Sequence, residues 1–186
     1  MNERAKIILD FWFIQSSKED WFKKDDKYDE KIKTLFLEDF KKAINYEYDY
    51  WQDTPEECLS LVIVLDQFSR NLFRNSTKAF SQDYKTRLIV NESIDRGYLE
   101  ELNQKKIHFF LMPLIHSEDI SDHIFGHKLL DTYLKTFEDY DKIKKAWNDH
   151  TLPIKKFGRY PHRNITLRRK STLEEEHFLK QPNSSW

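Results

Sequence analysis

The sequence predicts an all-α protein, and three observations support this prediction. Only three glycines and five prolines occur in 186 residues, whereas sheet proteins need many tight turns that are built from these residues. Apolar residues recur at spacings of three and four along most of the chain, as in helices that bury one face. The β-branched run 62–64 is compatible with a buried strand, but no second strand-like segment exists to pair with it.

The first two helices are expected over residues 5–13 and 25–48, where apolar residues form a stripe. The third, over about 55–74, has clear start signals: Thr54 can cap it, and Pro55 suits its first turn. Its first half, from Cys58 to Leu65, is apolar nearly all round. Other helices are therefore expected to surround it.

Further helices are expected over residues 81–96, 104–116, 119–137 and 139–156. Gly97 stands where a C-terminal cap belongs, and Pro113 should end or kink its helix. Residues 157–170 look irregular and basic. Ser171-Thr-Leu-Glu174 resembles a capping box for a short last helix through Leu179. The chain, residues 1–186, is thus expected to be one domain of seven or eight helices.

Charge and composition narrow the classes of function. The net charge of −1 disfavours nucleic-acid binding, although residues 150–173 contain seven Lys or Arg and no acid. Residues 19–57 contain thirteen acids against seven lysines, so the asymmetry points to a local anion site. A single cysteine, Cys58, excludes a disulfide within one chain and fits the cytoplasm. No secretory signal or stretch of roughly 20 apolar residues occurs, so no membrane association is expected.

Three charged residues follow the apolar half of the third helix. Asp66, Arg70 and Arg74 are spaced by four and so share one helix face. One interpretation is an ion pair that orders the end of the helix. The other is that Asp66 orients Arg70 while both arginines bind a carboxylate or phosphate, for which the planar guanidinium is suited.

A second polar group follows Pro113. His116 and Glu118 could supply a general base with an orienting carboxylate if the chain turns there. The alternative is that Ser117, Glu118 and Asp119 form the first turn of the next helix.

A third group is the loop Gly158-Arg-Tyr-Pro-His-Arg-Asn164, which combines Arg159, His162 and Arg163 with a stiffening proline. Loops held rigidly by a scaffold often carry function. The alternative is a loop that is docked by a buried arginine.

Asp119, His123 and His127 are candidate metal ligands, because their spacing of four places them on one helix face. Helical histidine pairs are common by chance, and no distant ligand is evident. We therefore expect neither a metal nor another cofactor.

With these motifs in view, the chain resembles a family of bacterial proteins known as domain of unknown function 924. The resemblance implies a tetratricopeptide-like α-α superhelix and no particular reaction. Two positions depart from the family pattern: Ser69 replaces a proline, and Arg168 replaces a glycine in Leu-Gly-Arg. The matching residues include Asp66, Arg70, Arg74, His116, Glu118, Arg159, His162, Arg163 and Asn164. The stretches that carry the resemblance are Leu9-Asp-Phe-Trp-Phe13, Trp51-Gln-Asp-Thr-Pro55, Leu65-Asp-Gln-Phe-Ser-Arg-Asn-Leu-Phe-Arg74, Pro113-Leu-Ile-His-Ser-Glu-Asp119, Phe157-Gly-Arg-Tyr-Pro-His-Arg-Asn164 and Ser171-Thr-Leu-Glu-Glu175.

Three functions follow as hypotheses. The first is binding of a small anion by the ligand-binding set Asp66, Arg70, Arg74, Arg159, Arg163 and Asn164. The second is a hydrolase or transferase that acts on an anionic substrate through His116, Glu118 and His162. The third is a helical scaffold for a protein partner, because superhelices offer concave faces.

Overall fold

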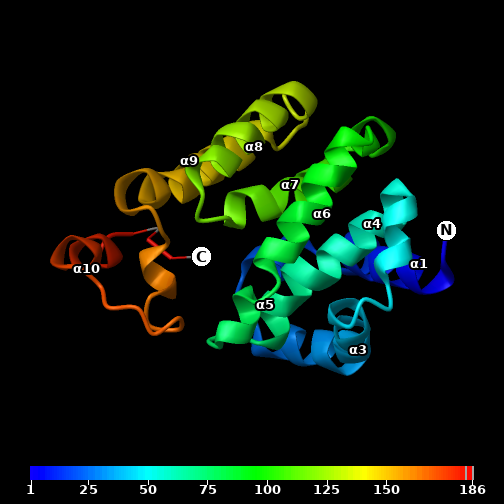
Figure 1. Ribbon diagram of the computed structural model, residues 1–186, viewed down its shortest axis with the longest axis horizontal. Coiled ribbons are helices and arrows are strands. Elements are labelled where there is room, and N and C mark those ends of the chain that lie inside the picture. The colour runs from blue at the N-terminus through cyan, green and yellow to red at the C-terminus, as the bar shows by residue number, and fades with distance from the viewer. Residues whose placement is uncertain (183, 186) are drawn as a thin grey trace.

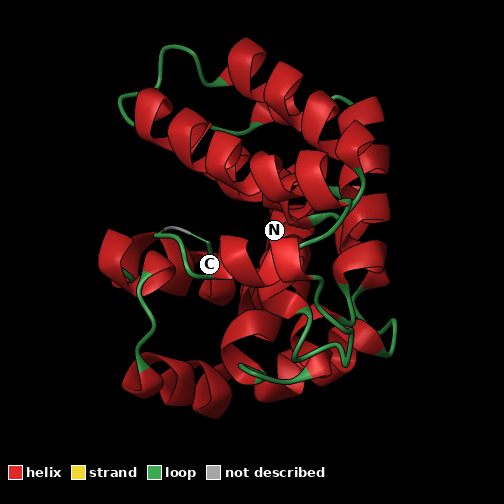
Figure 2. Cartoon of the chain, turned by 90° about the vertical axis from the view of Figure 1, so that its left-hand side faces the viewer, coloured by secondary structure: helices red, strands yellow, loops and turns green. Residues whose placement is uncertain are grey.

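The computed structural model describes residues 1–182 and 184–185, and every regular element in them is a helix (Figures 1 and 2). The all-α prediction is confirmed, and residues 62–64 are helical. No helix in this described part of the chain is long and apolar enough to span a bilayer. The α-helices are α1 (Glu3–Asp10), α2 (Lys18–Phe22), α3 (Asp26–Ile44), α4 (Pro55–Val62), α5 (Ser69–Leu72), α6 (Asp83–Asp95), α7 (Gln104–His116), α8 (Ile120–Tyr133), α9 (Tyr140–Phe157) and α10 (Leu173–Leu179).

Shorter helical segments of other types connect or extend these helices. The π-helical segments are η1 (Phe11–Gln15) and η3 (Ile63–Phe68), and the 3-10 segments are η2 (Asp49–Asp53), η4 (Thr77–Phe80), η5 (Tyr98–Glu101) and η6 (Pro161–Arg163). Because α4, η3 and α5 run on without a break, the described residues contain nine helices. The short α2 is the helix that the sequence interpretation missed.

Successive helices pack against one another along the second half of the chain. Helix α6 packs on α7, α7 on α8, and α8 on α9, and Figure 1 shows this succession leading away from α4 towards α10. Short connections make such neighbours antiparallel. The arrangement is the superhelical, tetratricopeptide-like array that was expected.

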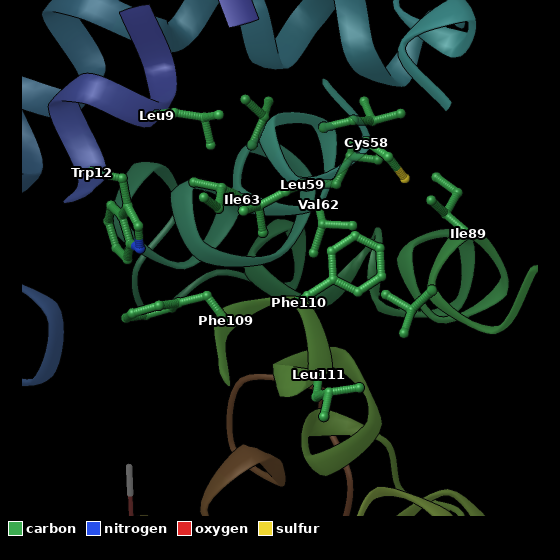
Figure 3. Packing of buried hydrophobic residues seen from close by; sticks show 14 of the residues in the cluster. Leu9, Trp12, Cys58, Leu59, Val62, Ile63, Ile89, Phe109, Phe110 and Leu111 are labelled. Atoms are coloured by element: carbon green, nitrogen blue, oxygen red, sulfur yellow. The ribbon is translucent and has the colours of Figure 1, made fainter. Parts of the chain in front are cut away.

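The continuous run from α4 through η3 forms the centre of the core. Every side chain from Cys58 to Leu65 is fully buried, which confirms the prediction that other helices surround this run. Figure 3 shows Leu59, Val62 and Ile63 between Leu9 on one side and Phe109 and Phe110 on the other, with Trp12 beside Phe109. Burying such large apolar side chains is the main stabilising contribution to the fold.

Several helix ends differ from the sequence prediction. The second predicted helix ends at Ile44, and a left-handed Tyr46 follows it. Thr54 makes no side-chain capping bond, so α4 begins on Pro55 without one. Helix α7 has the expected bounds, Gln104–His116, and does not end at Pro113, because the packing of its buried last turn outweighs the lost backbone bond.

The C-terminal segment follows the prediction more closely. Gly97 and Gly158 both adopt the left-handed conformation, at the ends of α6 and α9. Residues 158–170 are irregular apart from η6, and Phe157, expected in this irregular segment, is the last residue of α9. The capping box of α10 exists but is one residue later than expected, with Thr172 as the cap and Glu175 as its partner.

Candidate functional site

A cleft of about 670 Å³ opens beside the C-terminal end of α7. Side chains from η4, α6, the α7–α8 connection, α9 and the segment that follows α9 line it. The end of α7 and residues 158–167 therefore meet at one site, although about forty residues of chain separate them. This volume lies within the range of ordinary small-molecule pockets, roughly 300–1,000 Å³.

A histidine on the wall of the cleft is oriented by a buried carboxylate. His116 Nδ1 lies 2.8 Å from Asp66 Oδ1 and 3.0 Å from Oδ2. Asp66 belongs to the π-helical segment η3 and is completely buried, and π-helical turns are frequent at functional sites. His116 Nε2 forms no hydrogen bond with the described residues, and it is not sealed off from solvent. One ring nitrogen is thus fixed, and the other is accessible from the cleft.

The surroundings keep Asp66 ionised and His116 neutral. Burial alone would raise the pKa of Asp66, but Arg70 and His116 outweigh it and lower this pKa to about 2. Burial and the Arg70 guanidinium lower the pKa of His116 below its usual 6.5, although Asp66 opposes them. A neutral imidazole with an accessible nitrogen is a competent proton acceptor at neutral pH.

Two arginines and a second carboxylate extend this pair. Arg70 Nη1 lies 3.0 Å from Asp66 Oδ1, and Arg70 Nη2 donates to Asp83 Oδ2 at 3.2 Å. Arg163 donates to the same Asp83 oxygen at 3.2 Å and to the main-chain oxygen of His116 at 3.0 Å. The guanidinium of Arg163 also lies 4.5 Å from the ring centres of Phe80 and Tyr160. The result is a charge network in which acids and arginines alternate.

Glu118 lines the cleft, but its carboxylate is already hydrogen-bonded to residues of the segment that follows α9. Its carboxylate accepts from Arg169 at 2.5 and 2.9 Å and from the Tyr160 main-chain N–H at 2.9 Å. Burial would raise the pKa of Glu118, yet Arg169 and the Tyr160 N–H outweigh burial and lower it. These contacts give Glu118 the role of holding residues 160–169 against the end of α7.

Six of the nine predicted site residues lie outside the cleft lining: Asp66 and Arg70, which support His116 and Asp83 on its wall, and four others. Arg74 follows the end of α5 and pairs with Asp29 of α3 at 2.6 Å. Arg159 pairs with Glu175 at 2.6 Å, and Asn164 donates to Ser171 Oγ and accepts from Arg169, both at 3.0 Å. His162 packs beside Tyr160, with ring centres 5.3 Å apart.

The candidate metal residues have separate hydrogen-bonding roles. Asp119 caps α8 by accepting from the Ser121 N–H at 2.9 Å. His123 and His127 both bond Thr151 Oγ1, at 3.0 and 2.9 Å. Within the described residues, no group of three His, Cys, Asp or Glu side chains is arranged to hold a metal ion.

Two charged residues of the cleft were not predicted from the sequence, although their spacing could have indicated them. Asp83 and Arg87 lie four apart on α6, the same spacing that drew attention to Asp66 and Arg70. Arg87 donates to Asp122 Oδ2 at 2.6 Å. Arg169, the partner of Glu118, has no comparable signal because its contact spans 51 residues.

The comparisons with known proteins agree with this architecture. The chain is similar over nearly its whole length to a protein of unknown function from Agrobacterium tumefaciens whose structure is solved. The two share 31% identity and a TM-score of 0.85 over 95% of this chain and 97% of that one. No functionally curated protein matches the chain. Residues 8–183 match the family described as bacterial protein of unknown function (DUF924), and the chain therefore belongs to that family.

Proposed function

We propose that the chain is an enzyme that uses His116 as a general base on a small anionic substrate in the cleft. One observation carries the proposal: Asp66 fixes His116 Nδ1, and Nε2 remains accessible from a cleft large enough for a metabolite. A buried carboxylate that holds a histidine in this way sets its tautomer and its orientation. The cytoplasmic setting expected from the sequence fits such an enzyme.

The reaction that fits these groups is hydrolysis by an activated water. His116 Nε2 takes a proton from water as the water oxygen forms a bond to the electrophilic centre of the substrate. The bond to the leaving group then breaks, and the proton on Nε2 passes to that group, which restores the neutral imidazole. Asp66 stays ionised throughout and stabilises the imidazolium between the two transfers. A substrate hydroxyl in place of water would make the same step a transfer reaction.

The second candidate is binding of a small anion without chemistry. The observation that favours it is the presence of two guanidinium groups, Arg87 and Arg163, on the wall of one cleft. Of the four arginines expected in such a site, only Arg163 lines this cleft. Arg163 is also paired with Asp83, so part of its charge is already neutralised by the protein. Catalysis by His116 is therefore better supported than anion binding without chemistry.

Hydrolysis of two esters tests the proposal. One is 4-nitrophenyl acetate, which is neutral, and the other is the mono-4-nitrophenyl ester of adipic acid, which carries a negative charge. His116→Gln should lower kcat/KM by about 10²–10⁴, because it removes the base. Asp66→Asn should lower it less, and the acid limb of the wild-type pH profile should lie below the ordinary histidine pKa of 6.5. His177→Gln is the control, because this histidine is exposed on α10. Equal turnover by the wild type and His116→Gln would contradict the proposal, as would no turnover of either ester.

A further inference from the structure

Of the two arginines that line the cleft, Arg87 has fewer of its polar atoms bonded to the protein. Its Nη1 donates to Asp122 at 2.6 Å. Its Nε and Nη2 form no hydrogen bond with any described residue, and they are not sealed from solvent. A guanidinium presents its donors as a planar fork that matches carboxylate and phosphate oxygens. Nε and Nη2 of Arg87 are therefore available to donate hydrogen bonds to a ligand in the cleft.

The position of Arg87 is fixed before any ligand arrives. Asp122 is largely buried and also accepts from Ser117 Oγ at 2.5 Å, so the partner of Arg87 is itself held. The guanidinium lies 5.3 Å from the ring centre of Tyr84. A side chain that is already ordered loses little conformational entropy on binding.

Arg163, the other cleft arginine, is less suited to the same task. It is only 7% exposed, and its Nε is buried without a hydrogen-bond partner. Its Nη1 and Nη2 are used by Asp83 and by the His116 main chain. Arg163 therefore supports the base, whereas Arg87 remains available to a ligand.

Apolar side chains complete the lining of the cleft. Phe80, Ile120, Ile154 and Leu167 all contribute to its wall. An inorganic ion would leave this apolar surface uncovered, whereas an organic body would bury it at about 25 cal/mol per Å². The lining thus favours a ligand with both an anionic group and a hydrocarbon part.

Recognition of the charge would act at short range. The positive charge of Arg87 is neutralised by Asp122, and the negative charge of Glu118 by Arg169. In the charge network, Asp66 and Asp83 carry as much negative charge as Arg70 and Arg163 carry positive charge. The wall therefore has no large positive field, and affinity should depend on direct hydrogen bonds more than on long-range steering.

We propose that Arg87 anchors the anionic group of the substrate, and that this substrate is a small organic carboxylate or phosphate with an apolar body. The proposal rests on the proposed function in one respect, that the ligand of this cleft is the substrate of His116. The hydrocarbon part then lies along Ile120, Ile154 and Leu167.

Calorimetric titration with hexanoate, hexanamide, acetate and hexylphosphonate tests the anchor, since none of them contains an ester bond. Hexanoate should bind at least about tenfold more tightly than hexanamide, because a hydrogen bond to a charged group contributes about 1.5–3 kcal/mol. It should also bind more tightly than acetate, which lacks the apolar body. If hexylphosphonate binds more tightly than hexanoate, the natural group is a phosphate; the reverse order indicates a carboxylate. Either order supports the anchor.

Arg87→Gln should weaken hexanoate binding at least about tenfold, and Arg87→Lys should weaken it less because the charge remains. Arg96→Gln is the matched control, since Arg96 follows the same helix and donates to the main chain of Gln52 at an exposed position. If Arg87→Gln does not fold, the comparison of Arg87→Lys with wild type decides the question. Unchanged hexanoate affinity in the Arg87 variants, or no binding of either anion by the wild type, overturns the proposal.

The two proposals fail in different ways. If His116→Gln abolishes ester hydrolysis while the Arg87 variants bind hexanoate normally, the anchor is wrong and the base is right. If the Arg87 variants lose hexanoate while no ester is hydrolysed, the anchor stands, and the cleft binds its ligand without this chemistry.

Discussion

Replacing Asp66 by Asn isolates the contribution of the buried carboxylate to the stability of the protein. The change keeps the shape of the side chain but removes its charge. Asp66 is fully buried and accepts from His116, Gln67 and Arg70. An amide has one acceptor atom and two N–H donors, so in the variant its NH₂ group must face at least one of those donors. If Arg70 is the donor that the NH₂ group faces, its remaining hydrogen-bond partners are Asp83 and the main-chain oxygen of residue 66.

Two routes give the expected magnitude. Removing one partner of a buried ion pair costs about 3–5 kcal/mol, and the remaining contacts of Arg70 place the expected loss near 3 kcal/mol. The pKa of Asp66 gives a second value: it falls from 3.8 to about 2 in the folded state, which corresponds to about 2.5 kcal/mol of stability. Because the folded pKa is the lower one, this contribution is complete above the unfolded pKa. It is lost as the pH falls from about 5 towards 2.

Urea unfolding of the wild type and Asp66→Asn at several pH values from 7 to the acid limit of folding measures both quantities. The variant should be about 3 kcal/mol less stable at pH 7, and the difference should shrink as the pH falls. Asp149→Asn is the control, because Asp149 forms an exposed pair with Lys145 and should change stability by no more than about 0.5 kcal/mol. A loss below about 1 kcal/mol for Asp66→Asn at pH 7, or a difference independent of pH, would refute the reasoning.

Three further substitutions test other parts of the structure. Glu118→Gln should speed tryptic cleavage after Arg168, measured by mass spectrometry, because Glu118 holds the loop through Arg169 and Tyr160; an unchanged rate would contradict this role. Arg168→Gly should raise the melting temperature slightly, because Arg168 has a φ of 55°, which strains a side-chain-bearing residue by roughly 1 kcal/mol; a lower melting temperature would count against it. Gly126→Val should cost about 1–3 kcal/mol in urea unfolding, because even a Cβ would lie 3.3 Å from the Trp147 ring.

Most of the helices could be predicted from the sequence, because the features that indicate a helix lie close together in the chain. Apolar spacing and the scarcity of turn residues predicted the helices, and the apolar run from Cys58 marked the central one. Whether Pro113 ends its helix could not be decided from the sequence, because packing that a sequence does not display outweighs the local preference of proline. The cap of α10 was predicted within one residue because Ser171 and Thr172 are both competent caps, and only the backbone geometry selects between them.

The contacts of the site could be predicted only where the two residues lie close together in the sequence. The pairing of Asp66 with Arg70 follows from their spacing of four, and the structure contains it. The partners of His116 and Glu118 lie about fifty residues away, so no spacing could have revealed them. Arg74 and Arg159 were placed with the ligand residues by their chemistry, but acids on α3 and α10 hold them instead.

The buried charge network makes more sense as a support for His116 than as a source of stability. Buried ion pairs are often replaced by apolar residues at no cost, so Asp66, Arg70, Asp83 and Arg163 need another explanation than stability. Two ends of this network meet the same residue: Asp66 holds the His116 ring, and Arg163 holds its main-chain oxygen. Both contacts restrict the histidine from inside the protein, and they leave Nε2 as its accessible polar atom. A general base needs that combination of fixed orientation and an open nitrogen, whereas both ring nitrogens of His123 are bonded.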